Sequence, residues 1–185
     1  PEGAAGGGAG ARGAAVKAVF YGTPAEAVPS LEALAEMAEV RLVTTRPDRP
    51  RGRSGRPQPP PVKEAAGRLG LPIAQPERAV QDLERLRCLA PDVAVVVAYG
   101  QLLPVELLAV PAAGFLNVHF SLLPRWRGAS PVVRTLLAGD SLSGVTLMAL
   151  DEGMDTGPIV AMEPTPVGPG ETAGELTERL AELGA

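Results

Sequence analysis

Residues 16–44 read VKAVFYGTPAEAVPSLEALAEMAEVRLVT, and this stretch decides the fold. Two short apolar runs, Val16–Tyr21 and Val40–Thr44, have the length and composition of β-strands. The segment between them carries an apolar residue at every third position, at Val28, Leu31, Leu34 and Met37. That spacing is typical of a helix. A strand, a helix and a second strand in succession predict a parallel sheet with helices on both faces.

The rest of the chain continues this alternation. The run DVAVVVA at residues 92–98 is apolar throughout, as expected of a central strand buried on both faces. Further strands are predicted over 72–74, 114–119, 144–150 and 159–162, and helices over 62–69, 80–89, 101–110, 131–138 and 172–183. We therefore predict an α/β fold with a Rossmann-like, mostly parallel sheet and helices on both faces.

Size and composition set the broad class. With 185 residues, 45% of them apolar, the chain can form one well-buried domain. No apolar run approaches the roughly 20 residues that a membrane-spanning helix needs. The single cysteine, Cys88, excludes a disulfide within the chain and a cysteine-based zinc site, and we expect it to be a small core residue. Low cysteine usage and the lack of a secretory signal predict a cytoplasmic protein.

The first 15 residues, PEGAAGGGAGARGAA, have low complexity, and we expect a disordered leader. They contain a formal GxGxxG pattern between Gly8 and Gly13. A dinucleotide-binding pattern must follow a strand and begin a helix, whereas this one precedes the first strand. We therefore exclude a dinucleotide site there.

Charge is distributed unevenly. The net charge of −4 argues against nucleic-acid binding by the chain as a whole. The predicted loop Thr45–Pro61, however, combines one aspartate, Asp48, with arginines at positions 46, 49, 51, 53 and 56. Its local charge is thus +4, and the remainder carries −8. The loop is either a solvated basic segment or an arm that contacts phosphates, for which arginine has suitable bidentate geometry.

Polar side chains gather where two predicted strands end. Asn117 and His119 lie two residues apart at the end of the strand 114–119, so they share one face and could each donate a hydrogen bond to an oxyanion. The carboxylates Asp151, Glu152 and Asp155 follow the strand 144–150, and one of them could orient His119 or relay a proton. We expect both groups beyond the carboxyl ends of the strands, where open α/β sheets bind ligands.

Several reaction types are excluded by the residues present. No serine or cysteine occupies a G-x-S-x-G turn, which argues against covalent acyl-enzyme chemistry, and a lone histidine without a second one nearby argues against a metal site. Direct attack of a substrate nucleophile on a bound carbonyl remains. From the residues alone, His119 is equally well explained as a structural group with satisfied hydrogen bonds.

Longer motifs add a resemblance. The segments NVHFSLLPRWRG (117–128) and DEGMDTG (151–157) resemble the catalytic region of the 10-formyltetrahydrofolate-dependent formyltransferases, especially the members that act on methionyl initiator tRNA. The likeness also covers VFYGTP (19–24), TRPDRPRGR (45–53), PVKEAA (61–66) and VVVAYGQLLP (95–104). Nearly everything after the leader is included.

This resemblance implies a formyltransferase catalytic domain over residues 16–185. The implied activity is transfer of a formyl group from 10-formyltetrahydrofolate to the α-amino group of methionyl initiator tRNA, in translation initiation. We further expect no metal, no membrane association and a monomer. We expect the C-terminal β-barrel domain of the family to be absent. Two alternatives stay open: a sister formyltransferase acting on glycinamide ribonucleotide or an amino sugar, and a non-catalytic module that binds folate or RNA.

The same resemblance assigns residues. Asn117 and His119 would stabilise the oxyanion, and Asp155 would hold the state of the histidine and assist proton removal. A folate-contacting loop would comprise Ser121, Leu122, Leu123 and Pro124, and VVVAYGQLLP would flank the pterin. A tRNA-binding loop would comprise Arg49, Arg51, Arg53 and Arg56. The sequence departs from many relatives at Phe120, directly after the histidine.

Overall fold

The computed structural model describes residues 15–50 and 55–185. The predicted leader lies outside this range except for Ala15, and Arg51 and Arg53 of the arginine loop lie outside it as well. No helix in the described part of the chain is long and apolar enough to cross a membrane.

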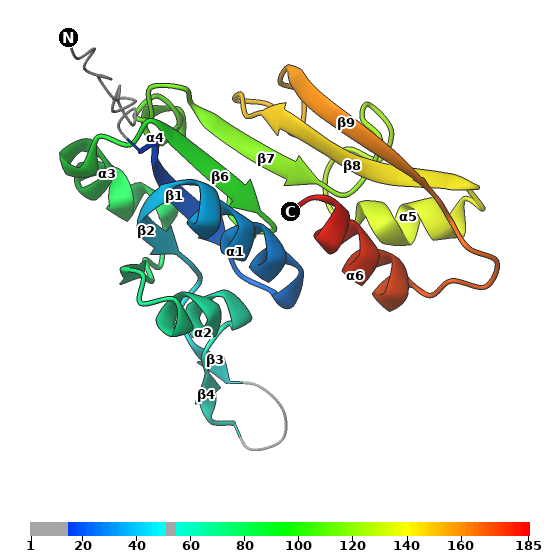
Figure 1. Ribbon diagram of the computed structural model, residues 1–185, viewed down its shortest axis with the longest axis horizontal. Coiled ribbons are helices and arrows are strands. Elements are labelled where there is room, and N and C mark those ends of the chain that lie inside the picture. The colour runs from blue at the N-terminus through cyan, green and yellow to red at the C-terminus, as the bar shows by residue number, and fades with distance from the viewer. Residues whose placement is uncertain (1–14, 51–54) are drawn as a thin grey trace, which may run out of the picture.

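A seven-stranded sheet organises the molecule, in the order β5-β2-β1-β6-β7-β8-β9 (Figure 1). The strands are β1 (Lys17–Gly22), β2 (Glu39–Thr44), β5 (Ile73–Ala74), β6 (Val93–Val97), β7 (Phe115–His119), β8 (Leu142–Ala149) and β9 (Ile159–Pro166). The five strands from β5 to β7 are parallel, whereas β8 and β9 run antiparallel to their neighbours. The predicted mostly parallel sheet is thus confirmed.

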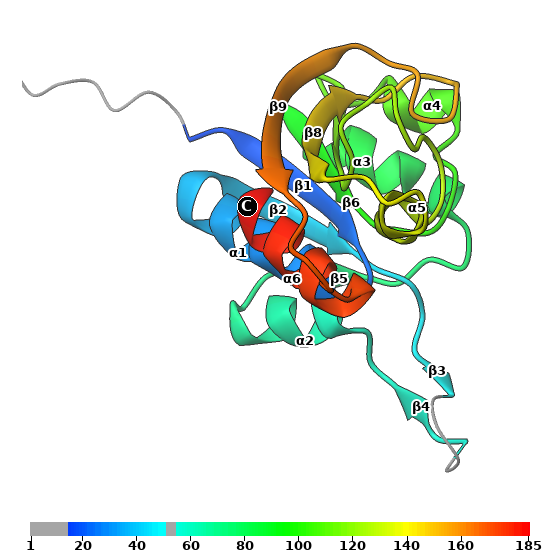
Figure 2. The ribbon, with the colours of Figure 1, turned by 90° about the vertical axis from the view of Figure 1, so that its right-hand side faces the viewer.

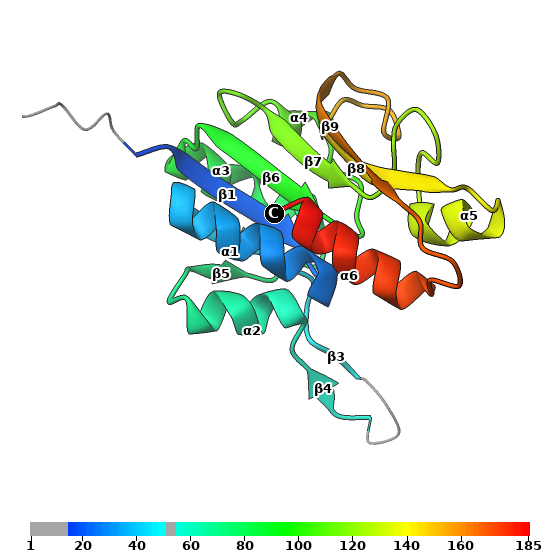
Figure 3. The ribbon, with the colours of Figure 1, turned by 45° about the vertical axis from the view of Figure 1, so that its right-hand side comes forward.

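Helices cover both faces of the sheet (Figures 2 and 3). One core contains residues of α1 (Val28–Met37), α2 (Pro61–Arg68), α5 (Pro131–Leu137) and α6 (Ala173–Leu183). The other contains residues of α3 (Leu83–Leu89) and α4 (Val105–Leu108). Short 3-10 turns, η1 (Ala25–Ala27) and η2 (Ala79–Asp82), precede α1 and α3.

The position of strand β1 between two cores explains why its sequence is continuously apolar. Phe20 belongs to the first core, while Val19 and Tyr21 belong to the second, so successive side chains alternate between two buried faces. Strand β6 lies between β1 and β7, as expected of the central apolar run.

Two expectations about local structure were wrong. The segment Thr45–Pro61 is not without regular structure, because β3 (Arg49–Pro50) and β4 (Pro57–Gln58) pair antiparallel in a small hairpin that stands away from the main sheet (Figure 3). Cys88 is exposed rather than part of the core. It lies two positions after the fully buried Leu86, which places it about 200° around the helix, on the opposite face.

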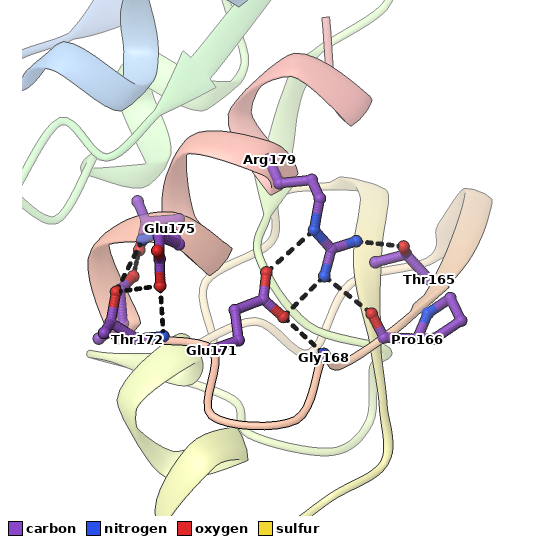
Figure 4. Close-up of polar contacts among 9 residues, drawn as sticks. Thr165, Pro166, Gly168, Glu171, Thr172, Glu175 and Arg179 are labelled. Carbon is purple, nitrogen blue, oxygen red and sulfur yellow. Dashed lines mark hydrogen bonds and ion pairs between the residues drawn. The ribbon is translucent and has the colours of Figure 1, made fainter.

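An arginine clamp fixes the end of β9 to α6 (Figure 4). The Arg179 guanidinium donates to both carboxylate oxygens of Glu171, at 3.0 and 2.9 Å, and to the carbonyl oxygen of Pro166 at 2.8 Å. It also contacts the Thr165 hydroxyl. The Gly168 N–H donates to the same carboxylate. Hydrogen bonds from Arg179, and then from Gly168, hold the pKa of Glu171 below its ordinary value.

We predict that Glu171→Gln lowers the melting temperature at pH 7 and that this difference disappears in acid. Because the folded-state pKa of Glu171 is lowered, its stabilising contribution is present above the unfolded pKa of about 4.3 and is lost as pH falls through the lower folded value. Melting curves between pH 3 and 7 measure this. Glu178→Gln, an equal change of charge at an exposed position of α6, serves as the control. A deficit that persists unchanged at pH 3 would contradict the clamp.

Candidate active site

The polar pair of β7 lies on one face of the sheet. Phe115 packs in the second core and Val118 in the first, so the odd-numbered positions of this strand share a face. Asn117 and His119 therefore point to the same side, as the alternation predicts. Asn117 is half-buried, and only 7% of His119 is exposed.

The imidazole of His119 is oriented by a backbone carbonyl. Its Nε2 lies 3.0 Å from the carbonyl oxygen of Trp126. A carbonyl oxygen can only accept a hydrogen bond, so Nε2 carries a proton and donates it. The other nitrogen, Nδ1, faces Oδ2 of Asp155 at 3.6 Å. The ring is thus held at one edge, while its Nδ1 edge faces a carboxylate.

Asp155 joins the elements of the site. Its Oδ2 accepts a hydrogen bond from the Gly128 N–H at 2.7 Å, and its Oδ1 accepts one from Nδ2 of Asn117 at 3.4 Å. The backbone of Asp155 has φ +51°, in the left-handed region that residues with a side chain rarely occupy. The structure therefore brings together the three residues predicted as catalytic, Asn117, His119 and Asp155.

The carboxylate reaches this position by a route that differs from the predicted one. Strand β8 runs antiparallel to β7, and its last residue, Ala149, pairs with Leu116. The C-terminal end of β8 therefore lies beside the N-terminal end of β7, at the opposite end from His119. The two strands do not end at the same edge of the sheet. Asp155 meets Asn117 and His119 because the loop 151–157 folds back over the sheet.

Tight packing within the loop 151–157 explains its glycines. Asp151 accepts hydrogen bonds inside the loop, from the Gly153 N–H at 3.0 Å and from the Thr156 hydroxyl at 2.8 Å. A Cβ on Gly157 would lie 2.0 Å from the carbonyl oxygen of Ala149. Asp151 therefore holds the turn, which leaves Asp155 to face β7.

Hydrogen bonds of the segment after His119 support the site. The Ser121 hydroxyl donates to the carbonyl oxygen of Arg125 at 2.6 Å, and the Thr146 hydroxyl of β8 donates to the carbonyl oxygen of Ser121 at 2.7 Å. Ser121 and Leu123 are buried, and the Leu123–Pro124 peptide is cis. None of the predicted folate-loop residues lines the large cavity described below.

Trp126, whose carbonyl orients His119, is itself anchored. Its indole N–H donates to Asp140 at 2.8 Å, and the Arg125 guanidinium binds the same carboxylate in bidentate fashion. The guanidinium also lies 4.3 Å from the centre of the indole ring. Hydrogen bonds from Arg125, and then from Trp126, lower the pKa of Asp140, so it is ionised at neutral pH.

A cavity of about 700 Å³ opens over these residues. Its walls are the segments 96–105, 117–120, 128–133 and 150–155, together with Glu26, Leu108 and Thr177. Asn117, His119 and Asp155 all belong to its lining, and the strip 96–105 within it is rich in apolar residues. A volume of this size suits an organic ligand such as a cofactor or drug-sized molecule.

Some site groups had no signal in the sequence. The Trp126 carbonyl and the Gly128 N–H are backbone groups, and any residue type provides them. Helix α5 begins at Pro131, as predicted. Serine is a common residue directly before a helix because its side chain can accept a hydrogen bond there, but Ser130 forms no such bond and has φ +58°. Arg49 and Arg56 are exposed on the hairpin and do not line the cavity.

Within residues 15–50 and 55–185, no cluster of three or more His, Cys, Asp or Glu could hold a metal.

Sequence comparisons identify relatives over almost the whole chain. It is 58% identical to methionyl-tRNA formyltransferase of Halorhodospira halophila over 174 residues, which cover 92% of this chain and 56% of that protein. It is 51% identical to methionyl-tRNA formyltransferase of Thermus thermophilus over 171 residues, which cover 91% of this chain and 56% of that protein. The chain thus spans about half the length of the curated relatives it matches.

Solved structures share the fold. Glycinamide ribonucleotide transformylase 1 from Geobacillus kaustophilus superposes with a TM-score of 0.74 and 27% identity, covering 92% of this chain and 93% of that one. Phosphoribosylglycinamide formyltransferase from Streptococcus pneumoniae has a TM-score of 0.75 at 23% identity, with 92% of each chain covered. A family model described as formyl transferase matches residues 17–185. On this match and these relatives, the chain belongs to the formyl transferase family.

Proposed function

We propose that this chain transfers a formyl group from 10-formyltetrahydrofolate to the α-amino group of methionyl initiator tRNA. The observation that carries the proposal is the convergence of Asn117, His119 and Asp155 on one cavity, in a chain that is 51–58% identical to methionyl-tRNA formyltransferases. The geometry supports acyl-type transfer, and the sequence relatives support the choice of acceptor.

In the proposed reaction, the neutral α-amino nitrogen attacks the formyl carbon and forms a new C–N bond. The formyl oxygen becomes an oxyanion, which receives hydrogen bonds from Nδ2 of Asn117 and from Nδ1 of His119 in its doubly protonated form, because Nε2 already donates its proton to the Trp126 carbonyl. Collapse breaks the bond between the formyl carbon and N10 of the folate. The proton lost by the attacking nitrogen ends on N10, so the reaction needs no additional reagent.

Asp155 serves two tasks in this scheme. Its carboxylate lies 3.6 Å from Nδ1 of His119, close enough to hold the direction of that ring edge and to offset the charge of a protonated imidazole. It also accepts a hydrogen bond from Asn117, which sets the direction of that amide. Because only 14% of its side chain is exposed, little water competes for these interactions.

We place the folate along the apolar strip 96–105, opposite the loop 150–155. This strip follows β6, the central strand, and contains backbone groups at its exit that can pair with the polar edge of a pterin. The predicted folate loop, Ser121–Pro124, contributes indirectly in this proposal. Its buried side chains and hydrogen bonds support Trp126 and hence the wall of the cavity.

The hairpin formed by β3 and β4 is the proposed tRNA-binding arm. Arg49 and Arg56 are exposed on it, and it extends away from the sheet (Figure 3). A cationic arm on an otherwise acidic chain suits contact with phosphates. Arg51 and Arg53, which belong to the same predicted loop, lie outside the described residues.

A panel of acceptors tests the proposal. The chain would be incubated with 10-formyltetrahydrofolate and, in separate reactions, with methionyl initiator tRNA, glycinamide ribonucleotide and an amino sugar nucleotide. We expect formylation of methionyl-tRNA and none of the others, measured by mass spectrometry of the acceptors. Formylation of glycinamide ribonucleotide alone would instead favour the second candidate, to which the superposed structures belong.

Substitutions at the polar residues test their roles. We predict that Asn117→Ala and Asp155→Asn each reduce kcat by about 10²–10³-fold, the usual cost of losing an oxyanion donor or the group that orients one. The affinity for 10-formyltetrahydrofolate, measured by calorimetry, should change little. Glu163→Gln, which removes a charge at an exposed position of β9, is the matched control. Unchanged kcat in both variants would disprove the assignment, and loss of folate binding alone would indicate a binding role.

A further inference from the structure

When His119 is neutral, all the charged side chains that line the cavity in the described chain are negative. Glu26, Asp151, Glu152 and Asp155 belong to its lining, whereas no lysine or arginine does so among the residues that the structure describes. A carboxylate-lined wall repels anions such as phosphates and attracts amino and hydroxyl groups, which can donate hydrogen bonds. The four carboxylates differ in what they already bind.

Glu26 enters the cavity from the side opposite to Asp155. It belongs to η1, which follows β1, whereas Asp155 lies against Asn117 and His119 of β7, and the strand order places β6 between β1 and β7. The turn before η1 is fixed, because the Thr23 hydroxyl donates to the carbonyl oxygen of Tyr99 at 3.0 Å and Ala27 is fully buried. Glu26 therefore stands at a defined position across the cavity from the catalytic loop.

The Glu26 carboxylate has no protein partner. The side chain is half-buried, yet it forms no hydrogen bond or ion pair within the described parts of the chain. In contrast, Asp151 and Asp155 accept hydrogen bonds from their surroundings, and Glu152 is exposed. A partly buried carboxylate without a partner loses hydration and gains nothing in return, which is typical of a group that meets a ligand.

We propose that Glu26 is a specificity-determining residue on the acceptor side of the cavity. Its carboxylate accepts hydrogen bonds from the amino or hydroxyl groups of an aminoacylated nucleotide and repels a phosphate at the same place. Glu26 lies outside the segment 96–105 along which the folate is placed, so we assign it to the acceptor. This inference rests on the proposed function. It adds a physical reason why a small acceptor that carries a phosphate is disfavoured.

Steady-state kinetics of Glu26→Gln test the assignment. This substitution keeps the size of the side chain and removes its charge. We expect the KM for methionyl initiator tRNA to rise about tenfold, the cost of one charge-assisted hydrogen bond, while the KM for 10-formyltetrahydrofolate stays unchanged. Glycinamide ribonucleotide, added as a competing ligand, should bind about tenfold more tightly than to the wild type. Glu36→Gln on the exposed face of α1, outside the cavity, is the matched control.

Two small inhibitors identify the donor group on the acceptor. Adenosine presents vicinal hydroxyls, and methioninamide presents an α-amino group. The inhibitor whose inhibition constant rises in Glu26→Gln, but not in Glu36→Gln, identifies the group that binds Glu26. If neither constant rises, the hydrogen-bonding role is refuted.

The outcomes separate this inference from the proposed function. Formylation of methionyl-tRNA by the wild type, with the same KM in Glu26→Gln as in the control, would overturn the role of Glu26 and leave the function intact. If the wild type formylates no acceptor, the proposed function fails. Calorimetric titration of glycinamide ribonucleotide then still tests the electrostatic role, because it needs no turnover, and equal affinities for wild type and Glu26→Gln would refute it.

Discussion

The position of the Asp155 carboxylate is the constraint on which the site depends. It accepts hydrogen bonds from Gly128 and Asn117 and faces Nδ1 of His119. These residues come from three segments, namely β7, the segment that follows it and the loop between β8 and β9. One carboxylate thus links elements that the chain separates by up to 38 residues. The antiparallel direction of β8 makes this possible, because the loop after it must fold back across β7.

Holding the site together requires unusual backbone conformations. Five residues other than glycine have positive φ in the described chain. Four of them surround the cavity or orient its histidine, namely Ala98, Trp126, Ser130 and Asp155. Such conformations persist only where the surroundings fix them. The Asp140 carboxylate provides part of that support, since it binds both Arg125 and the indole of Trp126. The loop and the sheet together orient the imidazole. In the proposed reaction, the ring therefore already has the orientation that catalysis requires.

Much of the fold could be predicted because its signals are local. The apolar runs of β1 and β6 and the three-residue spacing of α1 are each visible within a few residues. The direction of β8 could not be predicted in this way, because a strand has the same alternation whichever way it runs. The hairpin of β3 and β4 was missed since two-residue strands show no periodicity. Cys88 was misplaced because apolar character alone does not tell which helix face is buried.

The candidate site, like the fold, could be predicted only where its signals are local in the sequence. Alternation in β7 placed Asn117 and His119 on one face, but the choice of Asp155 over Asp151 came from the family resemblance. The structure adds a physical reason, because Asp151 is engaged within its own turn. Trp126 and Gly128 act through backbone atoms, and Glu26 gains significance only from its position across the cavity. Relations of this kind exist only in three dimensions.

The orientation of His119 offers the most direct test of the arrangement. It is the only histidine in the chain, so a long-range ¹H–¹⁵N correlation spectrum reports its ring without overlap. In the neutral protein we expect Nε2 to carry the proton, held by the Trp126 carbonyl, and Nδ1 to be unprotonated and directed to Asp155. On protonation, only Nδ1 should change its state. A neutral form with the proton on Nδ1 and a free Nε2 would contradict the site as described.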